Sequence, residues 1–267
     1  MENAIPLPPD IEAVVEDAWQ TARHVPGFLL EDEARLLGYL TACIPAAGAI
    51  VEIGSFKGRS TVILAKVAAH YGFGPVIAID PHTHNLTTAP SDVPRPSTYD
   101  AFLASLRTAN VEQHVEVHKT LSTEVSRTWS RPVRLLWIDG DHTYAGAKAD
   151  FDGFIPFVQP GGVVMLHDAL NNFTGPIRVF VEEMLRSNRF GPAGFVHSIA
   201  WAQLRPQDAA GFAADRRQLE RAAARLIPLV RDHEDLHGLA KIRFKLSRSR
   251  VPRKLPSLEQ LAARLVL

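Results

Sequence analysis

Residues 49–60 of this chain, AIVEIGSFKGRS, predict the unit from which its fold is built. It opens with a short, mostly apolar run that ends at Gly54, which is typical of a strand buried inside a parallel sheet. A turn over residues 55–59 follows, and residues 60–70 then carry apolar side chains at helical spacing. The sequence therefore predicts a strand, a tight turn and a helix, which together form the first unit of an α/β fold.

This alternation repeats along the chain. Further strands are predicted over residues 75–80, 115–118, 135–139 and 162–168, and residues 194–204 suit one or two closing strands. Helices are predicted over residues 9–23, 31–44, 97–110, 122–129, 145–158 and 176–188. Such repeats predict a doubly wound, largely parallel sheet with helices on both faces. We divide the chain into an N-terminal helical cap (1–45), a core (46–205) and a C-terminal helical extension with a basic tail (206–267).

The composition of the chain argues against several classes of protein. The 267 residues include 29 acidic and 29 basic side chains, so no net charge attracts nucleic acid. The single cysteine, Cys43, lies in an apolar run and is interpreted as a core residue, which excludes a disulfide framework. The N-terminus lacks a signal-peptide pattern, and no apolar run approaches the roughly 18 residues of a membrane span. We therefore expect a cytoplasmic protein.

The turn after the first strand has the spacing of a nucleotide site. Ligands of open parallel sheets bind beyond the carboxyl ends of the strands. Glu52, Gly54 and Gly58 fall at that edge. Asp80 ends the next strand, where a carboxylate can accept both hydroxyls of a ribose. A dinucleotide fingerprint reads G-x-G-x-x-G, whereas this G-x-x-x-G spacing resembles the turn of S-adenosylmethionine-dependent methyltransferases.

Three blocks make the resemblance more specific. They are VEIGSFKGRST at 51–61, IDGDHTYAGAKADF at 138–151 and VQPGGVVMLHD at 158–168. They resemble the class I methyltransferase family that includes macrocin O-methyltransferase and other sugar O-methyltransferases (methyltransferase family 24), over roughly residues 28–205. The resemblance implies a Rossmann-like, seven-stranded sheet whose last strand is antiparallel, with S-adenosylmethionine as cofactor.

The resemblance also assigns residues to the cofactor, namely Glu52, Gly54, Ser55, Gly58, Ser60, Asp80, Ser122 and Asp139. The turn residues would line the methionine and ribose portion, with Glu52 supporting the amino group or the loop. Asp80 would bind the ribose and Ser122 would contact the adenine. Asp139 would lie at the floor of the methyl-transfer site.

Methyl transfer to a hydroxyl requires alignment of the acceptor and removal of its proton. His142 is our candidate general base, because imidazole titrates near physiological pH and His142 follows Asp139 by three residues. Sugar methyltransferases of the family are similar here. The alternative is that His142 packs the loop onto the following helix. We assign Asp139 and His142 as the catalytic residues.

The acids after two neighbouring strands also suit Mg²⁺ or another divalent cation. Related metal-dependent enzymes place one acid after the fourth strand and a pair after the fifth, and Asp139 and Asp168 match two of these positions. The third is His167, an uncommon ligand for Mg²⁺ but an acceptable one for Mn²⁺, Fe²⁺ or Zn²⁺. Asn171 or Asn172 could replace it, so the sequence leaves metal dependence open.

The favoured function is O-methylation of a small-molecule acceptor, a hydroxyl of a sugar, glycoside or related natural product. The alternatives are an NAD-dependent Rossmann oxidoreductase and a non-catalytic cofactor-binding accessory protein. Residues 83–98, which include His84, are interpreted as a lid or as disorder without function. Residues 241–254 are interpreted as a solvated basic arm, or one that packs on a neighbouring subunit of a homo-oligomer. Anionic lipid, a sugar-phosphate carrier and nucleic acid are the alternative partners of this arm.

Overall fold

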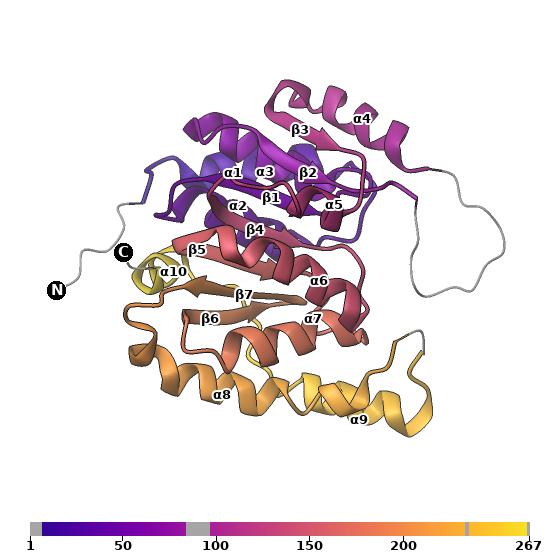
Figure 1. Ribbon diagram of the computed structural model, residues 1–267, viewed down its shortest axis with the longest axis vertical. Helices are drawn as coiled ribbons and strands as arrows, with labels where there is room; N and C mark the ends of the chain where they lie inside the picture. The colour runs from indigo at the N-terminus through magenta and orange to yellow at the C-terminus, as the bar shows by residue number, and fades with distance from the viewer. Residues whose placement is uncertain (1–6, 84–96, 233–234, 266–267) are drawn as a thin grey trace.

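The computed structural model describes residues 7–83, 97–232 and 235–265, and its centre is a seven-stranded sheet (Figure 1). The strand order is β3-β2-β1-β4-β5-β7-β6. The strands are β1 Ala49–Ile53, β2 Val76–Ile79, β3 Val115–His118, β4 Val133–Ile138, β5 Val158–Leu166, β6 Phe190–Val196 and β7 Ile199–Leu204. β7 is antiparallel to β5 and β6, and β1 to β5 pair in parallel. The predicted sheet with an antiparallel last strand is confirmed.

The middle strands are apolar on both faces. In β4, Leu135 and Trp137 point into one layer of the core, while Leu136 and Ile138 point into the other. All four side chains are at most 3% exposed. Successive side chains of a strand point to opposite faces, so a strand without polar alternation requires helices on both sides.

One face of the sheet is covered by helices from both ends of the chain. α1 (Ile11–Ala22), α2 (Glu31–Cys43), α3 (Arg59–Tyr71), α4 (Tyr99–Thr108) and α10 (Leu258–Arg264) contribute to this layer. Cys43 is buried within it, as predicted. The N-terminal helices thus share a core with the sheet, and the division of the chain at residue 45 stays a prediction.

The other face carries α5 (Ser122–Ser126), α6 (Tyr144–Phe154), α7 (Thr174–Val179), α8 (Ala213–Ala223) and α9 (Gly238–Arg248). A π-helical segment, Phe180–Leu185, continues α7. Short 3₁₀ turns cover Glu112–His114, Ile155–Phe157, Ala209–Phe212 and Ile227–Leu229. Figure 1 shows α8 and α9 at the periphery of the molecule, beyond β6.

Some predicted element boundaries, and the interpretation of the basic stretch, differ from the structure. The helix predicted over 145–158 ends at Phe154, because Pro156 lacks an amide N–H and cannot continue it, and β5 starts early, at Val158. The basic stretch is not a solvated arm, since its first part forms α9 and both Phe244 and Val251 are buried. Most of the predicted lid, with His84, lies outside the described residues.

Within the described residues, every helix is too short or too polar to cross a bilayer. The cytoplasmic location and the homo-oligomer stay predictions.

Candidate active site

A cavity of about 570 Å³ opens at the carboxyl ends of β1, β2, β4 and β5. The predicted site residues that line it are Gly54, Ser55, Ser60, Asp80, Ser122, Asp139, His142, His167 and Asp168. Glu52 and Gly58 do not form part of this wall. Most residues that the sequence assigned to one site therefore meet at one cavity.

The turn after β1 needs its two glycines for steric reasons within the protein. Gly54 has a φ of +88°, and a Cβ there would lie 2.1 Å from the carbonyl oxygen of Asp139. Gly58 has a φ of +92° as it enters α3, and a Cβ there would meet the Phe102 ring at 3.2 Å. Side chains are therefore excluded at both positions, and the turn stays close to the end of β4.

Glu52 supports this turn from inside the core. Its side chain is fully buried, and the Thr61 hydroxyl donates a hydrogen bond to Oε2. Oε1 has no hydrogen-bond partner among the described residues. Burial raises the pKa of Glu52 to about 7, although the hydroxyls of Ser60, Thr61 and Ser55 oppose the increase. An ionised Glu52 side chain therefore destabilises the folded protein at neutral pH.

Replacing Glu52 with glutamine should stabilise the protein at alkaline pH. The folded pKa of about 7 exceeds the ordinary 4.5, so the wild-type protein loses stability as pH rises from 4.5 through 7. Glutamine does not titrate, so the advantage of the variant should grow by about 3 kcal/mol across that range. Urea unfolding at pH 4.5 and pH 8 measures this difference. The exposed Glu12→Gln is the control, and equal pH dependence in wild type and Glu52→Gln would refute this role of Glu52.

Asp80 is fixed at the end of β2 by the backbone. The amide of Phe56 donates to Oδ2 at 2.7 Å, and the amide of His82 donates to Oδ1 at 2.6 Å. Each carboxylate oxygen keeps a second lone pair. Asp80 lines the cavity, so a pair of vicinal hydroxyls there would find a pre-oriented acceptor.

Ser122 contacts Asp150, a residue that was not predicted to belong to the site. Its hydroxyl donates a hydrogen bond to Oδ1 of Asp150, which also lines the cavity. Asp150 lies on the inner side of α6 and is 6% exposed. Burial raises the pKa of Asp150 to about 6, and the nearby negative charge of Asp141 adds to the increase. The only sequence signal for this pair was an acid at an inward-facing helical position.

The segment before α2 forms another wall that the sequence did not predict. Arg59 donates from Nε to the carbonyl of Val25 at 2.7 Å and from an Nη atom to that of Leu29 at 3.0 Å. This holds residues 26–29 against the cavity. Phe28 is 74% exposed, and its ring centroid lies 6.1 Å from that of Phe56. A bound molecule would therefore meet an aromatic wall at this side.

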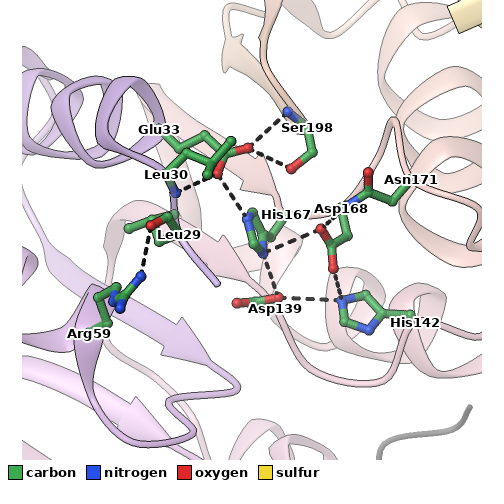
Figure 2. A network of polar contacts seen from close by, with 10 residues as sticks. All are labelled: Leu29, Leu30, Glu33, Arg59, Asp139, His142, His167, Asp168, Asn171 and Ser198. Atoms are coloured by element: carbon green, nitrogen blue, oxygen red, sulfur yellow. Dashed lines mark hydrogen bonds and ion pairs between the residues drawn. The ribbon is translucent and has the colours of Figure 1, made fainter. Parts of the chain in front are cut away.

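Two carboxylates face one imidazole nitrogen of the site (Figure 2). Nε2 of His142 lies 3.3 Å from Oδ1 of Asp139 and 3.6 Å from Oδ2 of Asp168. The His142 ring stacks on Phe173, with centroids 4.6 Å apart. Burial by itself lowers the pKa of His142, but Asp139 and Asp168 outweigh it and the pKa is raised. The arrangement therefore favours a positive charge at Nε2.

His167 lies between Asp139 and Glu33 of α2, as Figure 2 shows. Its Nδ1 lies 3.1 Å from Oδ1 of Asp139, and its Nε2 lies 3.5 Å from Oε2 of Glu33. Burial opposes a charged imidazole, but Asp139, Asp168 and Glu33 raise the pKa of His167 well above its ordinary value. The surroundings of His167 therefore favour the imidazolium form, and each ring nitrogen lies beside a carboxylate.

Glu33 anchors this chain of charges. It is 1% exposed, and Oε1 accepts hydrogen bonds from the backbone amide and the hydroxyl of Ser198, at 2.9 and 2.6 Å. Oε2 accepts a third from the amide of Leu30, at 2.9 Å. Burial opposes ionisation, yet His167 and Ser198 lower the pKa of Glu33 to about 2. A buried network therefore runs from α2 through His167 to Asp139.

The geometry favours a different metal-ligand set from the predicted one. Asp139, His142 and Asp168 each offer a ligand atom, and these atoms lie within 4.8 Å of one another. Nε2 of His142 is buried without a hydrogen-bond partner among the described residues. Two carboxylates and one imidazole nitrogen that has released its proton suit a divalent cation, whereas both ring nitrogens of His167 contact other carboxylates.

Comparison with known proteins agrees with this architecture. Residues 51–169 match the family described as a methyltransferase domain. The fold is similar to that of the O-methyltransferase NovP (TM-score 0.56, 11% identity, covering 73% of this chain and 98% of NovP). It is also similar to cofactor-bound Rv0187 from MTB (TM-score 0.51, 20% identity, 74% and 91% covered). A third similar structure is TomG, an O-methyltransferase of Streptomyces achromogenes involved in tomaymycin synthesis, in complex with S-adenosylmethionine (TM-score 0.50, 19% identity, 72% and 89% covered).

The family match runs from Val51 in β1 to Ala169, three residues beyond the end of β5, and includes most of the residues that line the cavity. Residues 51–169 of this chain are therefore similar to a methyltransferase domain.

Proposed function

We propose that this protein transfers the methyl group of S-adenosylmethionine to a hydroxyl of a sugar, glycoside or related natural product. The observation that carries the proposal is the cluster of Asp139, His142 and Asp168 on the wall of the cavity. It puts a proton acceptor beside the space where the chain would hold a methyl donor. The similarity to O-methyltransferases such as TomG supports the same reaction class.

The cofactor would lie across the ends of β1, β2 and β4. Asp80, already oriented by two backbone amides, would accept the ribose hydroxyls. Ser122 and Asp150 would face the adenine, because both line the cavity on the α5–α6 side. When bound, S-adenosylmethionine supplies an electrophilic methyl group, and its C–S bond breaks as the acceptor oxygen bonds to the methyl carbon.

Replacing Asp80 with alanine should weaken binding of S-adenosylhomocysteine by about 10- to 100-fold. Hydrogen bonds to a charged group contribute about 1.5–3 kcal/mol, and alanine removes the acceptor without filling the site. Isothermal titration calorimetry measures the change. Asp100→Ala, an exposed position on α4, is the control. Wild-type affinity in Asp80→Ala would remove Asp80 from the cofactor site.

His142 would take the proton of the acceptor hydroxyl at Nε2 and later release it to solvent. Asp139 and Asp168 face the same nitrogen and would stabilise the imidazolium that results. Because the carboxylates raise the pKa of His142, the proton-accepting form becomes abundant only above its ordinary value of 6.5. We expect the rate to rise with pH through that raised pKa.

A divalent cation fits the same three side chains, and Asp139, His142 and Asp168 would hold it. When bound there, the cation would lower the pKa of the acceptor hydroxyl. Dialysis against a chelator, followed by addition of Mg²⁺ or Mn²⁺, distinguishes a mechanism that uses His142 as base from one that uses a metal ion. Full activity after dialysis supports His142 as base alone, whereas activity restored by a cation supports the metal-assisted form.

A further inference from the structure

α9 exposes a stripe of large apolar side chains. Leu239, Ile242 and Leu246 are 78%, 54% and 58% exposed. They lie three and four residues apart, so they share one helical face. Phe244 lies on the opposite face and is buried in the core. Among the described residues six large apolar side chains are strongly exposed, and α9 carries three of them.

Cations flank this stripe. Lys241, Arg243 and Lys245 of α9 are exposed, and residues 236–258 contain seven Lys and Arg but no Asp or Glu. The neighbouring α8 exposes Arg217 and Arg221. The whole chain has a formal net charge of zero, so this positive charge is concentrated locally.

Acidic side chains close to α9 do not cancel that charge. Asp232 and Asp235 are exposed six and three residues before the helix begins, so two acids at this end face the seven cations of residues 236–258. Glu220 of α8 pairs with Arg186, at 2.7 Å. Apart from Ser247, the residues of α9 are apolar or basic.

We propose that α9 is an interfacial helix that docks this protein on an anionic membrane surface. Leu239, Ile242 and Leu246 would enter the boundary between headgroups and acyl chains, and the flanking cations would contact lipid phosphates. The buried Phe244 already fixes the helix to the core, so docking requires no refolding. The proposal does not depend on the identity of the methyl acceptor.

Charge favours a membrane over two other occupants. A second copy of the chain in a two-fold symmetric contact would bring α9 against α9 and place cations opposite cations. A nucleic acid would pair with the cations but leave the apolar stripe in water. An anionic bilayer satisfies both features at once.

Co-sedimentation of the full chain with vesicles tests the proposal. We expect binding to phosphatidylcholine vesicles that contain phosphatidylglycerol, weakening as salt is added, and little binding to phosphatidylcholine alone. Arg243→Gln with Lys245→Gln should weaken binding about fivefold per cation. Ile242→Ser with Leu246→Ser should weaken it at least about tenfold. All these side chains are exposed, so circular dichroism should show unchanged folding.

The charge-matched control is Arg107→Gln with Arg127→Gln, which removes two exposed cations elsewhere and should leave vesicle binding unchanged. Failure to bind either vesicle, equal binding to both, or an equal loss in the control would overturn the proposal. If Ile242→Ser with Leu246→Ser instead converts a dimer to a monomer and leaves vesicle binding unchanged, the stripe belongs to a second copy of the chain and the proposal is wrong.

Discussion

Replacing His142 with alanine should lower kcat by about 10²- to 10⁴-fold, the range expected for loss of a general base. Affinity for S-adenosylmethionine should stay close to that of the wild type, because His142 faces Asp139 and Asp168 rather than the turn after β1. Single-turnover kinetics and calorimetry measure the two quantities separately. A large loss of turnover with retained binding is the signature of a group that acts on the acceptor proton.

The control for this experiment is His70→Ala. His70 lies on α3 and pairs with Asp10, remote from the cavity lining. Unchanged turnover in His142→Ala would remove this residue from the mechanism. A wild-type protein that binds cofactor but never turns over would instead support the non-catalytic accessory function.

Replacing Glu33 with alanine should destabilise the protein by about 3–5 kcal/mol, because removing one partner leaves a buried charge without compensation. His167 would lose the carboxylate beyond Nε2, and the donors of Leu30 and Ser198 would lose their acceptor. Urea unfolding at pH 7 measures the loss. Turnover should also fall in molecules that remain folded, since Asp139 is held through His167.

Glu31→Ala is the matched control, because Glu31 lies on the same helix but is 55% exposed and pairs with Arg35 at the surface. Its loss should cost less than about 1 kcal/mol. The folded pKa of Glu33 is about 2 against an ordinary 4.5, so its contribution is present above 4.5 and is lost as pH falls towards 2. Wild type and Glu33→Ala should therefore converge in stability at low pH. Equal losses in Glu33→Ala and Glu31→Ala at pH 7 would contradict this role.

Much of the fold followed from local patterns. The run before Gly54 is apolar except for Glu52, and this pattern with its end at glycine indicated a buried parallel strand, now seen as β1. α9 was missed because its helix depends on distant contacts of Phe244 and Val251 with the core. The local alternation of cations and apolar residues gave no sign of them.

Residues of the candidate site could be predicted from the sequence where they directly follow a strand. Asp80 and Asp139 were assigned in this way, and both line the cavity. Glu33, Arg59 and Asp150 were missed because their partners lie far away in the sequence, as with the 134 positions between Glu33 and His167. Helix packing brings such pairs together, and these contacts cannot be predicted from residue spacing or composition.

Calorimetric titration of the wild-type protein is the decisive test of the proposed cofactor site. We expect S-adenosylmethionine and S-adenosylhomocysteine both to bind, with one site per chain, and a nicotinamide dinucleotide not to bind. Tight binding of the dinucleotide, with no heat from either sulfur compound, would contradict it.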